Sequence, residues 1–137
     1  MRILAVDYGQ KRIGLAVSDP LGFTAQGLQT LQNLSKKQVM AALLKVCKEY
    51  EVKEIVIGLP VNMNGSLGPK AVEIMNLIPA VEKELNLPVR TWDERLTSRE
   101  AGRLMIREGL SRSRQKENSD RLAATLILQM FLESRRR

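Results

Sequence analysis

The sequence predicts one α/β domain with a mixed five-stranded sheet flanked by helices. The chain has 137 residues, of which 44% are hydrophobic and 27% charged, and this composition is typical of a single globular domain. It opens with two strand-like runs that form a hairpin, after which strand-like and helix-like segments alternate. A hairpin is antiparallel and strand–helix–strand connections favour parallel pairing, so the sheet is expected to be mixed. We expect residues 1–137 to form one domain.

The first three predicted strands lie close together in the sequence. Residues 2–7 and 12–18 are apolar runs separated only by residues 8–11, which predicts a β-hairpin. Residues 24–31 are more polar and follow the turn-forming segment 19–22. We therefore expect a third, weaker strand near an edge of the sheet.

A helix and a buried strand come next. Ser35 and Gln38 form a capping box that begins the helix. Its apolar stripe consists of Val39, Leu43, Val46, Cys47 and Tyr50. Because Cys47 lies on this stripe, we expect it to be a buried hydrophobic residue and not a reactive thiol. Residues 54–60 form a continuous apolar run, which is typical of a central strand buried on both faces.

The second predicted helix follows a loop at residues 61–68. Pro69 suits the first turn of a helix that reaches about Leu85. Pro79 removes a backbone donor inside this helix, so we expect a kink or two shorter pieces. Residues 88–92 then form a fifth strand.

The C-terminal third is predicted to be helical apart from one linker. Thr97 and Glu100 form a capping box for a helix that ends at Gly109. Residues 110–118 are polar and basic and are expected to be a mobile linker, and residues 119–133 form the last helix. With the C-terminal helices taken together, the order of elements is βββ-α-β-α-β-α.

The composition restricts the chemistry that the chain can perform. It contains no histidine and a single cysteine, which argues against a zinc site and excludes catalysis by Ser-His or Cys-His pairs. Acid–base or metal chemistry must therefore come from carboxylates, with Lys, Arg or Tyr assisting. No apolar stretch approaches the roughly 20 residues of a membrane span, and no signal-peptide pattern is present, so we expect a cytoplasmic protein without membrane contact.

The charge distribution indicates a polyanionic partner. The net charge is +7, and residues 90–137 hold 12 basic and 7 acidic residues, whereas residues 1–89 hold 10 and 8. Most of the excess positive charge is therefore concentrated in the C-terminal third. A localised basic surface is typical of proteins that bind nucleic acid.

Acidic residues stand at three points where a site could form. Asp7 ends the first strand, Asp93 and Glu94 follow the fifth, and Asp120 begins the last helix. Sites in open α/β sheets form beyond the carboxyl ends of the strands, so the first three acids could converge there. On a helical wheel, Asp120 lies opposite the polar face and therefore towards the sheet. The polar face consists of Arg121, Thr125 and Gln129, and the opposite face of Ala123, Ile127 and Phe131.

Each acid also has a purely structural explanation. Asp7 could form a turn, Asp93 and Glu94 could pair with Arg95, and Asp120 could complement the helix dipole. Carboxylates that converge repel one another unless a cation lies between them. Mg²⁺ or Mn²⁺ takes oxygen ligands, and two such ions about 4 Å apart support phosphodiester hydrolysis.

Four segments together resemble the YqgF family of ribonuclease H-like proteins, described as pre-16S rRNA nucleases or Holliday junction resolvases. The segments are Asp7–Pro20, Gly58–Gly65, Asp93–Ser98 and Asp120–Gln129. The resemblance implies a ribonuclease H-like fold in which Asp7, Asp93, Glu94 and Asp120 are the catalytic acids. It implies Mg²⁺ or Mn²⁺ held by Asp7, Glu94 and Asp120, with Asp93 as the alternative to Glu94.

The sequence departs from the family pattern in one loop. Asn64 stands where relatives commonly have Asp, and we interpret this as a tolerated turn substitution. The wider superfamily often has an acid near the end of the fourth strand, but residues 58–70 contain none. Asp93 and Glu94 must therefore compensate if the site is active.

Six basic residues are candidates for binding nucleic acid. They are Lys11, Arg12, Arg95, Arg112, Arg114 and Lys116. Arg95 could either pair with the neighbouring acids or contact phosphate. The last three lie in the predicted linker that leads into Asp120, so substrate binding there could order the linker and position the acid.

The preferred interpretation is a metal-dependent nuclease that matures the 5′ end of precursor 16S rRNA. The alternatives are a Holliday junction resolvase acting on branched DNA and a non-catalytic nucleic-acid-binding protein. A phosphotransferase is disfavoured because such enzymes close two domains over a nucleotide. We expect a monomer or a weak homodimer, and a resolvase that cuts two strands symmetrically favours the dimer.

Overall fold

The computed structural model describes residues 1–96 and 112–136, with the side chains of residues 96 and 112–120 excluded. The strands are β1 (Arg2–Tyr8), β2 (Arg12–Ser18), β3 (Ala25–Gly27), β4 (Leu31–Gln32), β5 (Val52–Leu59) and β6 (Val89–Asp93). The helices are α1 (Lys36–Glu49), α2 (Pro69–Leu85), the short 3₁₀ helix η1 (Glu94–Leu96) and α4 (Arg112–Arg136).

The strands form one mixed sheet in the order β3-β2-β1-β5-β6. β1 and β2 pair antiparallel as the predicted hairpin, with Asp7 opposite Gly14. β5 pairs parallel with β1 on one side and with β6 on the other. The predicted mixed sheet is therefore confirmed, and the carboxyl ends of β1, β5 and β6 lie at one edge.

The single strand predicted over residues 24–31 is wrong, because this segment forms two short strands. β3 and β4 both pair antiparallel with β2. Leu28, between the two strands, and Leu31, in β4, pack against the same core. Residues three apart point to opposite faces of a regular strand, so the chain must leave the strand path to bury both.

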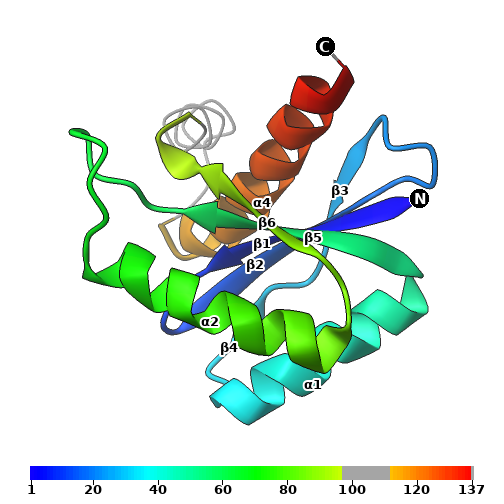
Figure 1. Cartoon of the computed structure of the whole chain (residues 1–137), viewed down its shortest axis with the longest axis horizontal. Coiled ribbons are helices and arrows are strands. Elements are labelled where there is room, and N and C mark those ends of the chain that lie inside the picture. Colours follow the sequence, from blue (N-terminus) through cyan, green and yellow to red (C-terminus); the bar gives the residue numbers. More distant parts are fainter. Residues whose placement is uncertain (97–111, 137) are drawn as a thin grey trace.

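Two layers of helix cover the sheet (Figure 1). α1 and α2 lie on one face and α4 crosses the other. Within β1, Leu4 and Val6 belong to the core under α1 and α2, whereas Ile3 and Ala5 belong to the core under α4. This alternation decides to which side each residue at the end of the strand points.

The helices on the first face follow the predicted pattern with one exception. Ser35 and Gln38 form the expected capping box of α1. Cys47 is buried, and burial raises the pKa of its thiol to about 11. α2 runs through Pro79 as one helix, so two shorter pieces are not formed. Buried residues on both sides of the proline hold α2 together; they are Ala71, Ile74, Val81 and Leu85.

The C-terminal region differs more from the prediction. The helix predicted at residues 97–109 lies outside the described residues. α4 already begins at Arg112, so the linker predicted up to residue 118 is wrong for residues 112–118. This segment contains Arg, Gln, Lys and Glu without Gly or Pro, and those residues have high helix propensity. None of the described helices is long and apolar enough to cross a membrane.

The helical wheel of α4 is confirmed on one side only. Ile127 and Phe131 are buried against the sheet, and Gln129 is exposed. Arg121 and Thr125 were expected on the polar face, yet both lie over Gly27 of β3. The reason is that α4 crosses β2 and β3 as well as β1, so a second stripe of the helix is covered.

A buried acid attaches the C-terminal end of α4 to the sheet. Glu54 in β5 is only 5% exposed. It accepts hydrogen bonds from both terminal nitrogens of Arg135, with Nη1 at 2.7 Å from Oε1, and from Nε of Arg90 at 3.2 Å. The Arg135 guanidinium also lies 4.5 Å from the centre of the Phe131 ring. The sequence pattern did not predict this cluster.

Candidate active site

Asp7 and Glu94 form a carboxyl pair at the edge where β1 and β6 end. Asp7 lies two residues after Ala5, so strand alternation directs its side chain to the α4 face. Burial, a hydrogen bond with Asp7 and the negative charge of Asp7 together raise the pKa of Glu94 to about 8. In the absence of a cation, Glu94 therefore favours its protonated form at neutral pH.

Gly58 forms the floor beneath this pair. A Cβ atom built on Gly58 would lie 2.7 Å from Oε1 of Glu94 and 2.7 Å from Cδ1 of Ile127. Neither contact is possible without movement, so glycine is required for Glu94 and α4 to approach β5 this closely. Ile127 also shows that α4 borders the pair. No role was predicted for Gly58 from the sequence, although a glycine inside a buried apolar run is a signal of close approach.

Asp93 is directed away from this pair and binds Arg95. The Asp93 carboxylate accepts hydrogen bonds from the Arg95 backbone N–H at 3.0 Å, from Nε at 2.9 and 3.1 Å, and from Nη2 at 2.6 Å. These bonds from Arg95 lower the pKa of Asp93. Trp92 packs edge-on against Phe131 of α4, so the next residue in the strand points to the opposite side. The geometry thus brings Glu94, and not Asp93, to Asp7.

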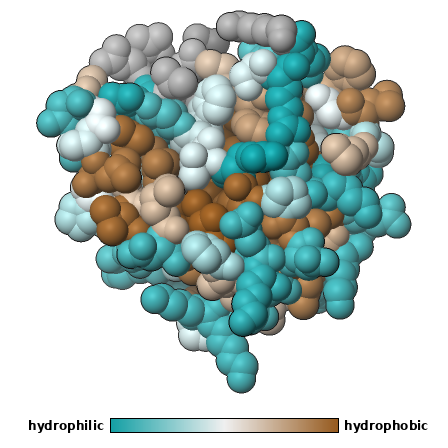
Figure 2. Space-filling model, in the orientation of Figure 1, coloured by the Kyte–Doolittle hydropathy of each residue, from teal (hydrophilic) through white to brown (hydrophobic). Residues whose placement is uncertain are grey.

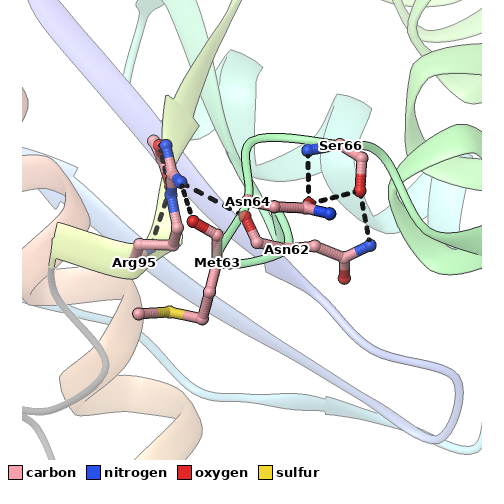
Figure 3. A network of polar contacts seen from close by, with 6 residues as sticks. Asn62, Met63, Asn64, Ser66 and Arg95 are labelled. Carbon is pink, nitrogen blue, oxygen red and sulfur yellow. Dashed lines mark hydrogen bonds and ion pairs between the residues drawn. The ribbon is translucent and has the colours of Figure 1, made fainter.

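Arg95 also holds the loop between β5 and α2, as Figure 3 shows. Its Nη1 donates to the backbone carbonyls of Asn62 and Met63, each at 3.2 Å. Within the loop, Asn64 Oδ1 accepts hydrogen bonds from the backbone N–H and hydroxyl of Ser66 at 3.0 and 2.6 Å. The first of the two roles expected for Arg95, pairing with an acid, is therefore present, and Asn64 acts as a turn-forming residue.

The third candidate ligand, Asp120, belongs to α4 and precedes Ile127 by seven residues. Seven residues are about two helical turns, so the two positions share a face of the helix. The Asp120 side chain lies outside the described part of the structure. Among the described side chains, no group of three or more acidic, His or Cys residues comes together.

The basic candidates fall into two groups. Lys11 and Arg12 lie at the β1–β2 turn, close in the chain to Asp7. Arg112, Arg114 and Lys116 lie in the first turns of α4, and the structure describes only their backbone.

Lys70 is a further residue near the pair, and it was not predicted from the sequence. It lies in the first turn of α2, and its positive charge opposes the rise in the pKa of Glu94, so it is close to the carboxyl pair. The signal was its position at the start of the helix that follows β5, since such helices begin at the edge of the sheet where the strand ends.

The residues present fit a hard divalent cation. Two carboxyl groups in hydrogen-bond contact supply the oxygen ligands that such a cation prefers. A chain without histidine offers no nitrogen ligand from imidazole. This donor set suits Mg²⁺ or Mn²⁺ and is unsuited to zinc.

The sheet order, the crossing of α4 and the acidic pair at the end of β1 define a ribonuclease H-like domain. Solved structures of similar fold include T. thermophilus RuvC in complex with Holliday junction substrate, with a TM-score of 0.61, 19% identity, and 99% and 96% of the two chains covered. The Fowlpox virus resolvase with substrate Holliday junction DNA has a TM-score of 0.59 and 16% identity over 100% of each chain. At these identities the likeness concerns the fold.

The family is shown by closer comparisons. The family model "RuvX: Holliday junction resolvase" matches residues 1–134. A protein of Clostridium botulinum (strain Eklund 17B / Type B), named "Putative pre-16S rRNA nuclease", is 51% identical over 97% of each chain. One of the same name from Syntrophomonas wolfei is 48% identical, covering 97% of this chain and 94% of its own. The chain belongs to the RuvX (YqgF) family, as the four sequence segments predicted.

Proposed function

We propose that this protein is a nuclease that hydrolyses phosphodiester bonds with the help of Mg²⁺ or Mn²⁺, and that its substrate is the 5′ end of precursor 16S rRNA. The observation that carries the proposal is the Asp7–Glu94 carboxyl pair at the edge of the sheet. The names of the relatives that are about half identical support the choice of substrate.

In this proposal each residue at the edge has a separate task. Asp7 and Glu94 would hold the cation, with Asp120 as the third ligand from α4. When bound, the cation supplies a Lewis acid that stabilises the charge developing on phosphate and water. Gly58 leaves room for Glu94, and Asp93 with Arg95 holds the turn from which Glu94 projects.

The basic residues would bind the substrate backbone. Lys11 and Arg12 belong to the same end of the sheet as Asp7, and Lys70 adds a charge beside Glu94. Arg112, Arg114 and Lys116 would contact phosphates farther along the strand. Such contacts position a nucleic acid without selecting its sequence.

Cleavage assays with acid variants test the proposal. The protein is incubated with a 16S precursor and with a four-way DNA junction, in Mg²⁺, Mn²⁺ or EDTA. We expect Asp7→Asn, Glu94→Gln and Asp120→Asn each to lower the cleavage rate at least 100-fold, because each removes one proposed ligand. Glu49→Gln, on the exposed surface of α1, is the control and should cleave normally. Cleavage that persists in the three variants would exclude this site.

The same assay separates the competing functions. The description of the matching family model favours junction resolution as the second candidate. Paired cuts in the junction, together with a dimeric mass in solution, would favour the resolvase. Binding without cleavage in every metal would favour a non-catalytic nucleic-acid-binding protein.

A further inference from the structure

A groove of about 580 Å³ lies on the opposite side of β1 from the carboxyl pair. Its walls come from the end of β1, the first turn of α1 and the first three turns of α2, and they include Tyr8, Lys36, Val72, Glu73, Asn76 and Leu77. The volume lies within the usual range for small-molecule sites. Figure 2 shows hydrophobic residues exposed among hydrophilic ones on the face that α2 forms. Val72, one of the lining residues, is 43% exposed.

Two residues that line the groove are direct chain neighbours of residues at the proposed active site. Tyr8 follows Asp7 in β1, so alternation directs Asp7 towards α4 and Tyr8 towards α1 and α2. Pro69, at the start of α2, lines the groove, and the next residue, Lys70, acts on Glu94. A substrate strand that crossed this end of the sheet from the carboxyl pair would pass Lys70 before it reached the groove.

The chemistry of the groove suits a nucleotide. Tyr8 is half-buried and offers an aromatic ring, while Val72 and Leu77 provide apolar surface. Bases stack on aromatic side chains whatever their sequence. The Asn76 amide can donate and accept hydrogen bonds, and the Glu73 carboxylate accepts them, as the edge of a base requires. Lys36 supplies a charge for a phosphate at the rim.

Tyr8 and Glu73 both line this groove. The pKa of Tyr8 is raised by burial and, secondarily, by the negative charge of Glu73. The phenol and the carboxylate thus lie near the same part of the groove, one offering a ring face and the other an acceptor.

We propose that this groove binds one unpaired nucleotide of the substrate, on the strand that leads away from the bond that is cleaved. The identity of the substrate as a nucleic acid rests on the proposed function. A base must be unstacked to lie on Tyr8, so a fully paired helix cannot fill the groove. The groove therefore favours a single-stranded RNA end over an intact four-way junction.

An abasic scan tests this inference without cleavage. Single-stranded RNAs spanning the 16S precursor end, each lacking one base in turn, are titrated against the protein in EDTA by fluorescence anisotropy. We expect the loss of a base at one position to weaken binding roughly tenfold, because one stacked base is lost, while losses elsewhere have little effect. If no position differs from the others, the groove does not hold a base.

Variants then connect that position to Tyr8. Tyr8→Leu should weaken binding of intact RNA roughly tenfold and should abolish the effect of the missing base, whereas Tyr8→Phe keeps the ring and should preserve both. Phe23→Leu is the matched control, because Phe23 is a 59% exposed aromatic residue in the β2–β3 turn. A persisting abasic effect in Tyr8→Leu would contradict the inference.

Two further measurements distinguish a base held in the groove from a general loss of nucleic-acid binding. Asn76→Leu, on the exposed surface of α2, should reduce the abasic effect even if Tyr8→Leu fails to fold. Binding of a four-way junction should be unaffected by the groove variants; equal weakening of junction and RNA would overturn the inference. The scan measures binding in EDTA and does not depend on cleavage. If the cleavage assay showed that Asp7 and Glu94 are not needed, the proposed function would be excluded, but the result of the scan would still stand.

Discussion

At the scale of single residues, two neighbouring acids have opposite environments. Glu94 is directed to Asp7, and burial together with that carboxylate raises its pKa to about 8. Asp93 is held by Arg95, which lowers its pKa. A pair of acids whose pKa values are driven apart is a common sign of a functional site.

Glu94→Gln is expected to stabilise the metal-free protein at alkaline pH. The folded pKa of Glu94 lies above its ordinary value of 4.5. The stability that protonated Glu94 contributes is therefore fully present below pH 4.5 and is lost as the pH rises to about 8. At pH 9 the variant should gain on the order of 2 kcal/mol in unfolding free energy, and at pH 4 almost nothing. Urea denaturation in EDTA at both pH values measures this.

Asp93→Asn is a control for which the expected change in stability at alkaline pH has the opposite sign. Its folded pKa is lowered, so the ionised form contributes stability above the ordinary pKa of 3.8, and this contribution is lost as the pH falls through the lowered pKa. The variant should therefore be less stable than the wild type at pH 9. A gain in both variants would show that the stabilisation does not depend on the Asp7–Glu94 contact.

Arg95→Lys tests whether this residue positions the loop or binds phosphate. Lysine keeps the charge but cannot reach Asp93 and the carbonyls of Asn62 and Met63 together. We expect faster amide hydrogen exchange at residues 61–66 and roughly tenfold slower cleavage, with unchanged RNA affinity. Weaker binding with an unchanged loop would instead indicate a phosphate contact.

At the scale of elements, the position of α4 depends on contacts in its middle and at its C-terminal end. Ile127 meets the sheet at Gly58, near the carboxyl pair, and Arg135 binds the buried Glu54 at the C-terminal end of the helix. Asp120 precedes Ile127 by two turns of the same helix. The attachment at Glu54 therefore contributes to the position of the proposed third ligand.

Arg135→Met should destabilise the protein through this attachment. It leaves the buried Glu54 carboxylate with Arg90 alone, and a buried acceptor that loses a partner costs about 1–3 kcal/mol. Urea denaturation measures the loss. Arg136→Met is the control, since Arg136 is exposed and bonds only the Gly22 carbonyl and the Phe23 ring among its described contacts. Equal losses in the two variants would contradict a special role for Glu54.

At the scale of the whole molecule, the excess positive charge is concentrated in the C-terminal third. Residues 90–137 carry 12 of the 22 basic residues of the chain, against 7 acidic ones. The structure places three of these basic positions in the first turns of α4, just before Asp120. A substrate bound at the proposed site would therefore meet this charge.

Replacement of Arg112, Arg114 and Lys116 by Ala should reduce the salt dependence of RNA binding. If all three contact phosphate, the slope of log affinity against log salt should decrease by about 2 for a single strand, because each contact releases counterions. Anisotropy titrations in EDTA at several salt concentrations measure the slope. An unchanged slope would show that this segment does not bind phosphate.

The matched control removes the same number of positive charges from a different part of the surface. Alanine at Lys37, Lys45 and Lys48 removes three exposed basic residues from α1. This variant should keep the slope of the wild type. A decrease equal to that of the first variant would mean that binding responds to net charge and not to the position of α4.

Local patterns predicted the elements whose signals lie within a few residues. The capping box at Ser35 and Gln38, the opening hairpin and the buried run at residues 54–60 were all confirmed. The predictions for residues 24–31 and 112–118 were wrong. In the first, Leu28 and Leu31 turn into the core beneath α1, and in the second, intrinsic helix propensity outweighed polarity.

The sequence alone determined the family, the sheet and the positions of the acids at the ends of β1 and β6, because strand periodicity and motif spacing are local properties. The tertiary structure decided that Glu94 meets Asp7 while Asp93 binds Arg95. That choice depends on Trp92 packing against α4 and on Arg95 reaching a loop more than thirty residues earlier. Contacts between distant segments select one of two adjacent carboxylates, and a local sequence pattern cannot predict such contacts.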